Sequence, residues 1–480
     1  MGFLTVNCKL KLWGERMLSK DKINQILAAA LEGGADFAEI FYENTKRNSI
    51  SLENSKLERV KTGYDLGVGV RVITGEQVSY AYTDDISLES LLETAKVAGS
   101  ASQGQSKVSI ADLTTQEPSL VHPITIEPTT VDKKKKVQVV EDANKAARGY
   151  DEQIRQVMVG YSDKEQEIMV ANSEGLLIED RRTYTRMRVR AIASDGTEMQ
   201  TGSENPGQQM GFELFEDYAP AEVGKEAARQ AVTMLGAKAA PSGKMPVVIN
   251  NGFGGVLFHE ACGHGLEADA VQKGASVFAD KVGEQVASKL VTAVDDATVR
   301  NGWGSFGVDS EGNQAQRTVL IKDGILQDYM YDKKTARKEG RKSTGNGRRN
   351  SYRSLPLPRM TNTFIEQGAS SPDEIISAVD DGFYAKKLSG GQVEPTTGEF
   401  VFNVSEGYLI KDGSLSQPVR GATLIGRGID VLNKVSMVGS DLELAPGMCG
   451  KQGQSVPAGV GQPTLLIDEI TVGGTERKGE

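Results

Sequence analysis

The stretch 66-LGVGVRVITGEQVSYAY-82 indicates most clearly how the first half of the chain folds. Residues 66–73 and 77–82 are rich in β-branched and aromatic side chains, and Thr74-Gly75-Glu76 forms a turn signal between them. Such runs around a short turn predict two neighbouring antiparallel strands. Residues 49–53 alternate in the same way and predict an earlier strand. Together they predict a β-meander.

Helices are predicted on both sides of this meander. Apolar residues between positions 23 and 31 recur at helical spacing after Ser19, a residue type that caps helix N-termini. Gly33-Gly34 ends that pattern, and residues 88–97 fit a second helix. A helix followed by a meander and another helix is typical of the α+β class.

The same order returns further along the chain. A helix is predicted near 131–147, strands between 153 and 199, and another helix near 221–235. Asn54-Ser55 has a counterpart in Asn172-Ser173, and Tyr64 has one in Tyr184. Either residues 19–100 and 131–236 are an internal duplication, or two short meanders have converged.

The character of the sequence changes after Pro241. A strand at 247–250 and a helix over 254–268 are followed by many strand-like segments and glycine turns, with hairpin signals at Asp323-Gly324 and Asp412-Gly413. We therefore expect three parts: an N-terminal extension at 1–18, an α+β domain at 19–240, and a C-terminal domain at 241–480. The last should be mainly antiparallel β-structure carrying one functional helix.

Composition limits the classes of function. The chain has 480 residues, 38% hydrophobic and 25% charged, with a net charge of −10, which favours a soluble protein of several domains over a nucleic-acid binder. No apolar run approaches the roughly 18 residues of a membrane span. The three cysteines, Cys8, Cys262 and Cys449, are scattered. A disulfide framework is therefore not expected, and we expect a reducing compartment, the cytoplasm.

The strongest functional signal is 258-FHEACGHG-265, which holds two of the three histidines. In the H-E-x-x-H motif of zinc peptidases, histidines four residues apart share one helical face, and the glutamate is the general base. Here His259 and His264 are five apart, which on an ideal helix rotates the second imidazole by about 140°. Gly263 and Gly265 relax the backbone. We therefore predict a widened π-type turn or a helix end at Gly263.

Two imidazoles around a glutamate favour a zinc site in which His259 and His264 bind the metal and Glu260 activates a bound water. The alternative is a pair of histidines that only form hydrogen bonds. A catalytic zinc usually takes a third protein ligand. Four residues are candidates: Cys262, Glu267, Asp269 and Cys449. Burial is more typical of Cys262, whereas Cys449 lies in a glycine-rich turn near Lys451, which favours the thiolate. The residues alone do not decide among them.

Several motifs together resemble the TldD/PmbA family of metallopeptidases, specifically its zinc-bearing TldD branch. They are the H-E-x-x-x-H of residues 259–264, 343-STGNGRR-349, 359-RMTNT-363, 418-PVRGATLIG-426 and 449-CGKQGQ-454. All lie in the C-terminal half. The N-terminal half is similar in layout, and residues 1–16 fall outside the resemblance.

The resemblance implies that His259, His264 and Cys449 bind Zn²⁺ and that Glu260 is catalytic. The activity it implies is hydrolysis of peptide bonds in unfolded or extended polypeptides. It also implies a dimer, either of two identical chains or with a paralogous PmbA/TldE-type subunit that lacks the H-E-x-x-x-H motif.

Two other functions compete with this interpretation. One is a non-catalytic binding or regulatory protein whose fold the metal stabilises. Such a structural metal site would need a fourth ligand, for example Cys262. The other is a nucleic-acid regulator that uses the seven Lys and Arg residues between 337 and 353. That segment is either a solvated loop or a loop that contacts substrate through Arg348, Arg349 and Tyr352. The third histidine, His122, is expected at the surface of a linker.

Overall fold

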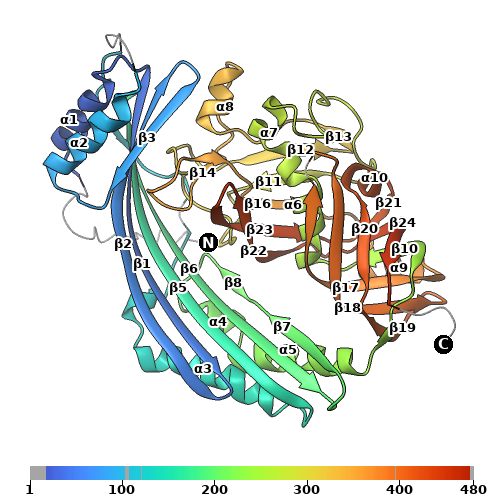
Figure 1. The fold of residues 1–480 in the computed structure, drawn as a ribbon. Coiled ribbons are helices and arrows are strands. Elements are labelled where there is room, and N and C mark those ends of the chain that lie inside the picture. Colours follow the sequence, from blue (N-terminus) through green and yellow to red (C-terminus); the bar gives the residue numbers. More distant parts are fainter. Residues whose placement is uncertain (1–17, 103–107, 121, 395, 476–480) are drawn as a thin grey trace, which may run out of the picture.

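The computed structural model describes residues 18–102, 108–120, 122–394 and 396–475 (Figure 1). The extension expected at 1–18 lies, except for Leu18, outside the described residues. The fold class is α+β, as predicted. No helix of the described residues is both long and apolar enough to span a membrane.

The first half forms one eight-stranded sheet with very long central strands. Its order is β3-β2-β1-β5-β6-β4, with β7 and β8 also paired to β6. The strands are β1 (Phe37–Glu53), β2 (Lys56–Thr74), β3 (Gln77–Thr83), β4 (Thr114–Gln116), β5 (Ile154–Asn172), β6 (Leu176–Ser194), β7 (Met199–Glu204) and β8 (Gly207–Gln208). The predicted meander is β1 to β3. β1 and β2 are much longer than expected, because they pair with each other over their full length and β1 also pairs along β5.

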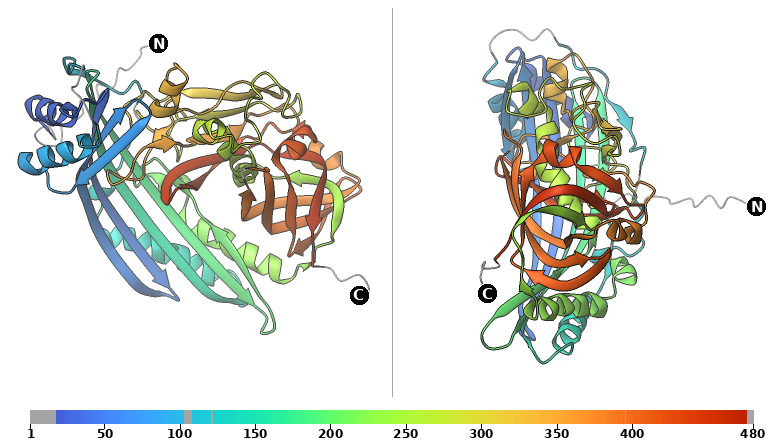
Figure 2. Two further views of the ribbon diagram at one scale, coloured as in Figure 1. Left: turned by 45° about the horizontal axis from the view of Figure 1, so that its top comes forward. Right: turned by 90° about the vertical axis from the view of Figure 1, so that its right-hand side faces the viewer.

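Helices cover the two ends of this sheet (Figure 2). They are α1 (Lys20–Leu31), α2 (Leu88–Gly99), α3 (Lys133–Arg148), α4 (Leu214–Asp217) and α5 (Pro220–Leu235), with a 3₁₀ turn η1 (Pro128–Thr130). Ser19 caps α1 through its side chain, as predicted. Apolar residues of α1 and α2 form one core with β1 and β2, and those of α3 and α5 form another with β5 and β6.

These two groups meet where β1 pairs antiparallel with β5, so the same order of elements recurs on both sides of that pair. The duplication itself stays a prediction.

The second half contains three further sheets. One has the order β17-β10-β24-β20-β18-β19-β9, and β17 also pairs with β18, which closes five of its strands into a ring; β21 adds to β24. The strands are β9 (Lys238–Ala239), β10 (Gly243–Ile249), β17 (Asp381–Glu394), β18 (Glu399–Lys411), β19 (Ser414–Arg420), β20 (Thr423–Arg427), β21 (Val435–Val438) and β24 (Leu465–Gly473).

A six-stranded sheet has the order β13-β12-β11-β16-β23-β22, and β14 pairs with β15. These strands are β11 (Ala293–Asp296), β12 (Arg317–Lys322), β13 (Ile325–Leu326), β14 (Gly347–Arg348), β15 (Leu357–Pro358), β16 (Asn362–Ile365), β22 (Glu443–Lys451) and β23 (Gln454–Gln462). Short helices join them: η2 (Gly252–Gly255), α6 (Val256–Ala261), η3 (Gly263–Leu266), α7 (Ala268–Gln272), α8 (Lys333–Lys338), α9 (Pro372–Ser377) and α10 (Gly428–Asn433). Asp323-Gly324 and Asp412-Gly413 turn the hairpins β12–β13 and β18–β19, as predicted, with positive φ at all four residues.

Strand pairing among the described residues of the second half is mostly antiparallel. Three pairs of strands are parallel: β10–β17, β16–β23 and β9–β19. The first sheet uses residues 37–208, and the later sheets use residues 238–473. The boundary expected at 240 stays a prediction.

Buried charges join the two halves. Arg71 of β2 bonds Glu39 at 2.7 Å and Glu311 at 2.6 Å, and Arg349 bonds Glu39 at 2.6 Å. All four side chains are buried. Removing one member would leave an opposite charge buried without its partner, which is strongly destabilising. The network therefore holds the segment around Arg349 against the long sheet.

Candidate metal centre

The helix that carries the first histidine ends between the two histidines. It spans Val256–Ala261, and Cys262 leaves helical geometry with φ −128° and ψ −46° before the 3₁₀ turn Gly263–Leu266 begins. The predicted helix end is therefore correct, and the alternative of a widened π-type turn is wrong. A side chain at Gly263 would place its Cβ 2.2 Å from the Sδ of Met360, so close packing requires glycine there. The break reorients the second imidazole toward the first.

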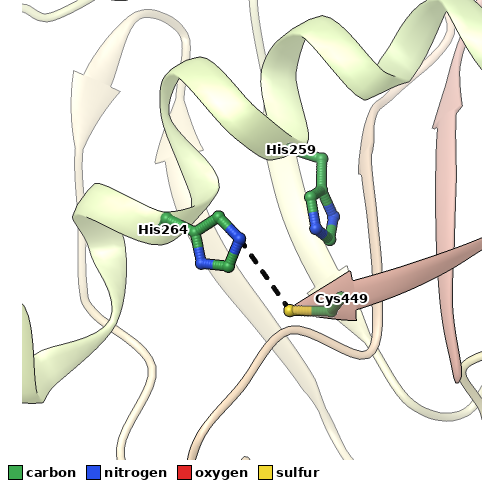
Figure 3. A group of neighbouring side chains, drawn as sticks. All are labelled: His259, His264 and Cys449. Atoms are coloured by element: carbon green, nitrogen blue, oxygen red, sulfur yellow. Dashed lines mark hydrogen bonds between the residues drawn. The ribbon is translucent and has the colours of Figure 1, made fainter. Parts of the chain in front are cut away.

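Three predicted ligands converge at this break (Figure 3). One candidate ligand atom each from His259, His264 and Cys449 lies within 4.8 Å of the other two. The imidazole centroids are 5.3 Å apart with planes at 84°, and the Nε2 of His264 lies 3.9 Å from the Sγ of Cys449. Cys449 comes from β22, which approaches the helix from the far end of the chain. Two imidazoles and a thiol are a donor set that suits zinc.

Glu260 lies beside this group and remains accessible. Its Oε2 is 3.8 Å from the Nε2 of His264, and its side chain is 29% exposed. The side chains of His259 and Cys449 are buried. The Nδ1 of His259 is also buried and has no hydrogen-bond partner among the described residues. The group therefore presents donors on its buried side and a carboxylate toward solvent.

A chain of charges orients His264. Its Nδ1 lies 3.0 Å from Glu267, and the ammonium of Lys451 lies 2.9 Å from the same carboxylate oxygen. Burial alone would raise the pKa of Glu267, but the charges of His264 and Lys451 lower it to about 2. A carboxylate on one ring nitrogen leaves the other, Nε2, directed at Cys449, which is the usual support of a metal-binding histidine.

The same surroundings favour the thiolate of Cys449. Burial alone would raise the pKa of this thiol, but hydrogen bonds and charge from the two imidazoles lower it to about 5. Arg359 also donates a hydrogen bond to the backbone oxygen of Cys449. The thiolate is the form that binds metals.

The other candidates for a third ligand lie apart from this group. Cys262 is fully buried, and burial raises the pKa of its thiol. Asp269 contacts Lys451 at 2.5 Å. Glu267 touches His264 from the side of the ring that points away from Cys449. Sequence patterns assign no role to Arg359, and they indicate Lys451 only as a cation that favours the thiolate of Cys449.

One alternative for the basic segment and the expectation for the third histidine are wrong. Arg348, Arg349 and Tyr352 are buried, so this part of the basic segment is not a solvated loop. Arg349 belongs to the buried network with Glu39. His122 is also buried, and its Nδ1 accepts a hydrogen bond from the backbone of Asn301 at 3.0 Å. Burial requires such partners, and they come from segments distant in the sequence.

Two histidines, a thiol and a nearby carboxylate on this α+β scaffold define the class of a candidate metal-dependent hydrolase. Models of the PmbA/TldA metallopeptidase domains match residues 38–102 (domain 1), 126–235 (central domain) and 242–474 (C-terminal domain). The chain therefore belongs to the TldD/PmbA metallopeptidase family.

Similar proteins extend this result. The chain is 44% identical over 453 residues to the "Metalloprotease TldD homolog" of Haemophilus influenzae, covering 92% of this chain and 93% of that protein. It is 41% identical over 477 residues to the protein of the same name from Buchnera aphidicola subsp. Acyrthosiphon pisum, covering 96% and 98%. The crystal structure of TldE from Thermococcus kodakarensis shares the fold, with a TM-score of 0.76 and 19% identity over 94% of this chain and 100% of that one. The names of the relatives support a metalloprotease.

Proposed function

We propose that this protein is a zinc-dependent peptidase that hydrolyses unfolded or extended polypeptides. His259, His264 and Cys449 would bind Zn²⁺, and Glu260 would act as the general base. The observation that carries the proposal is the convergence of these three donors within 4.8 Å beside an accessible carboxylate.

The geometry fits a catalytic metal better than a structural one. Structural zinc usually has four protein ligands, whereas catalytic zinc has three and an open position. Among the described residues, His, Cys, Asp and Glu side chains supply three candidate donors at this point. Cys262, the fourth ligand that a structural site would need, is not among them. The accessible side of the group faces Glu260.

When bound there, zinc would supply a Lewis acid that acidifies water and polarises the scissile carbonyl. Glu260 would accept the proton of the attacking water and deliver it to the departing amine. Glu267 would hold His264 in the tautomer whose Nε2 is free to bind. Lys451 would keep Glu267 ionised.

The strand that carries Cys449 also supports an extended substrate. β22 is the edge strand of the six-stranded sheet, and the exposed residues Met448 and Gly450 flank Cys449 on it. Edge strands present unpaired N–H and C=O groups, to which an extended chain can add with little dependence on sequence. A peptide on this edge would pass the candidate metal centre.

The test compares Glu260→Gln with the wild type in zinc content and in hydrolysis of an unstructured peptide. We expect unchanged zinc and a loss of rate of about 100-fold or more, the usual contribution of a general base. Glu216→Gln, an exposed glutamate on α4, is the matched control and should hydrolyse normally. Full activity in a zinc-loaded Glu260→Gln protein would refute the mechanism.

A dimer with an identical or PmbA/TldE-type subunit and a cytoplasmic location remain predictions. Sedimentation of the chain alone and together with such a subunit would test the first.

A further inference from the structure

A cavity of about 640 Å³ lies between the long sheet and the C-terminal half. One wall is the face of β1, β2, β5 and β6 that the C-terminal half covers (Figure 1). The opposite wall includes Trp303, Arg348 and the hairpin β22–β23, from which Met448 and Pro457 line the cavity. Because Met448 precedes Cys449, the cavity and the candidate metal centre share a strand.

The sheet wall carries a concentration of positive charge. Arg47 of β1 is directly opposite Lys164 of β5, and Lys164 is directly opposite Tyr184 of β6. Side chains alternate between faces along a strand, so Arg186 and Arg188 point to the same side as Tyr184. Like charges directly opposite each other destabilise a sheet. An anion between these strands would relieve this repulsion.

The cavity has little negative charge of its own. Asp65 is paired with Arg353 at 2.8 Å, and Asp163 is paired with Lys136 at 2.6 Å. Six cations of the lining have no carboxylate oxygen of a described residue within 4.0 Å of their charged nitrogens: Arg47, Lys61, Lys164, Arg186, Arg188 and Arg348. This excess of positive charge stands in a protein whose net charge is −10.

The pKa values of two of these cations, Lys164 and Arg186, are lowered. Burial lowers the pKa of Lys164 to about 7, Glu43 opposes that shift, and the charges of Arg47, Arg182 and Arg348 add to it. Burial also lowers the pKa of Arg186 to about 10, and its buried Nε has no hydrogen-bond partner among the described residues. An anion in the cavity would relieve both effects.

We propose that this cavity is a subsite that binds carboxylate groups of the peptide substrate, so that the protein prefers acidic segments. The inference rests on the proposed peptidase function. Tyr184 and Trp303 pack edge to face, with ring centroids 5.4 Å apart. Their rings offer an apolar surface for the methylene groups of the acidic side chains of the peptide. A peptide lying on β22 would reach the cavity on the side of Met448.

The test measures binding of dye-labelled, unstructured peptides to the full chain by fluorescence anisotropy. One peptide carries glutamates in its middle and an amidated C-terminus, and the reference peptide carries glutamines instead. We expect the acidic peptide to bind about tenfold more tightly, as charge-assisted hydrogen bonds of this kind provide. A third peptide, with glutamines and a free C-terminus, shows whether side-chain or terminal carboxylates occupy the subsite.

The variant Lys61→Gln/Arg188→Gln should abolish this preference. Both side chains are exposed, so the fold should be unaffected. Arg190→Gln is the matched control, because Arg190 lies on the same face of the same strand but outside the cavity. It should keep the preference.

Three results would overturn the inference. The first is equal binding of acidic and neutral peptides, and the second is loss of the charge preference in the Arg190→Gln control as well. The third is displacement of the acidic peptide by a single-stranded oligonucleotide that binds more tightly through Lys61 and Arg188.

All binding is measured on the Glu260→Gln protein, whereas hydrolysis is measured separately. A charge preference without Glu260-dependent hydrolysis would refute the peptidase mechanism alone. Glu260-dependent hydrolysis without a charge preference would refute the subsite alone.

Discussion

The Sγ of Cys449 lies 3.9 Å from the Nε2 of His264, although 185 residues separate them in the chain. The contact joins a helix end to an edge strand of the six-stranded sheet. Burial alone would raise the pKa of the thiol and lower that of His264. The imidazoles instead lower the pKa of the thiol, and Glu267 together with the thiol raises that of His264. Such a pair suits a metal that binds a thiolate beside an imidazole.

We predict that Cys449→Ala loses zinc at about pH 7, where the wild type is loaded. Removal of a group that only hydrogen-bonds to a metal ligand lowers metal affinity by roughly 10- to 100-fold. The zinc affinity of Cys449→Ala should fall by more than this. Metal analysis after dialysis measures it. Cys262→Ala is the control, since Cys262 lies outside the group, and it should retain the metal. Unchanged zinc in Cys449→Ala would assign the third ligand elsewhere.

Glu267→Gln should weaken zinc binding by about 10- to 100-fold, because a neutral amide orients His264 less firmly than a carboxylate. Titration against a chelator of known affinity gives the constant. Asp269→Asn removes a carboxylate that also contacts Lys451 but does not contact the ring of His264. Its effect should be clearly smaller. Equal effects would mean that Glu267 acts only through Lys451.

Gly263→Ala should destabilise the protein by about 1–3 kcal/mol, the usual cost of overpacking. The added methyl group would meet Met360, which is fully buried and has little room to move. Urea denaturation measures the change in free energy of unfolding. Gly450→Ala is the comparison, because a Cβ there meets no atom within 4 Å. Similar stability of the two variants would contradict the packing argument.

The contribution of His122 to the free energy of unfolding should decrease as the pH falls from about 7.5 to about 5.5. Burial lowers the pKa of this imidazole in the folded protein, opposed by the charge of Asp180. The unfolded chain therefore takes up the proton first, and the contribution of His122, complete above its ordinary pKa of about 6.5, is lost below it.

His122→Asn isolates this effect, because the amide oxygen can still accept the hydrogen bond from Asn301. Denaturation curves across the range should show that the wild type loses stability relative to the variant as the pH falls. The same slope in both proteins would show that other groups cause it.

Local patterns were sufficient for much of the fold. The helix after Ser19 and the turns at Asp323-Gly324 and Asp412-Gly413 follow from capping and from positive φ, which depend on a few neighbouring residues. β1 and β2 are longer than the local alternation indicates, because their outer parts are held by pairing with each other and, for β1, with β5. Pairing across more than a hundred residues has no local signal.

The sequence by itself determined the candidate metal-binding and catalytic residues, two histidines on either side of Glu260, and its glycines predicted a break in the helix. Only the tertiary structure decided that the break is followed by a tight 3₁₀ turn in which Met360 packs where a side chain of residue 263 would lie. It also decided which side chains are buried, turning the basic segment around Arg349 into part of a buried network. Spacing constrains neighbours along a helix, whereas burial and charge compensation depend on segments that meet only when the chain has folded.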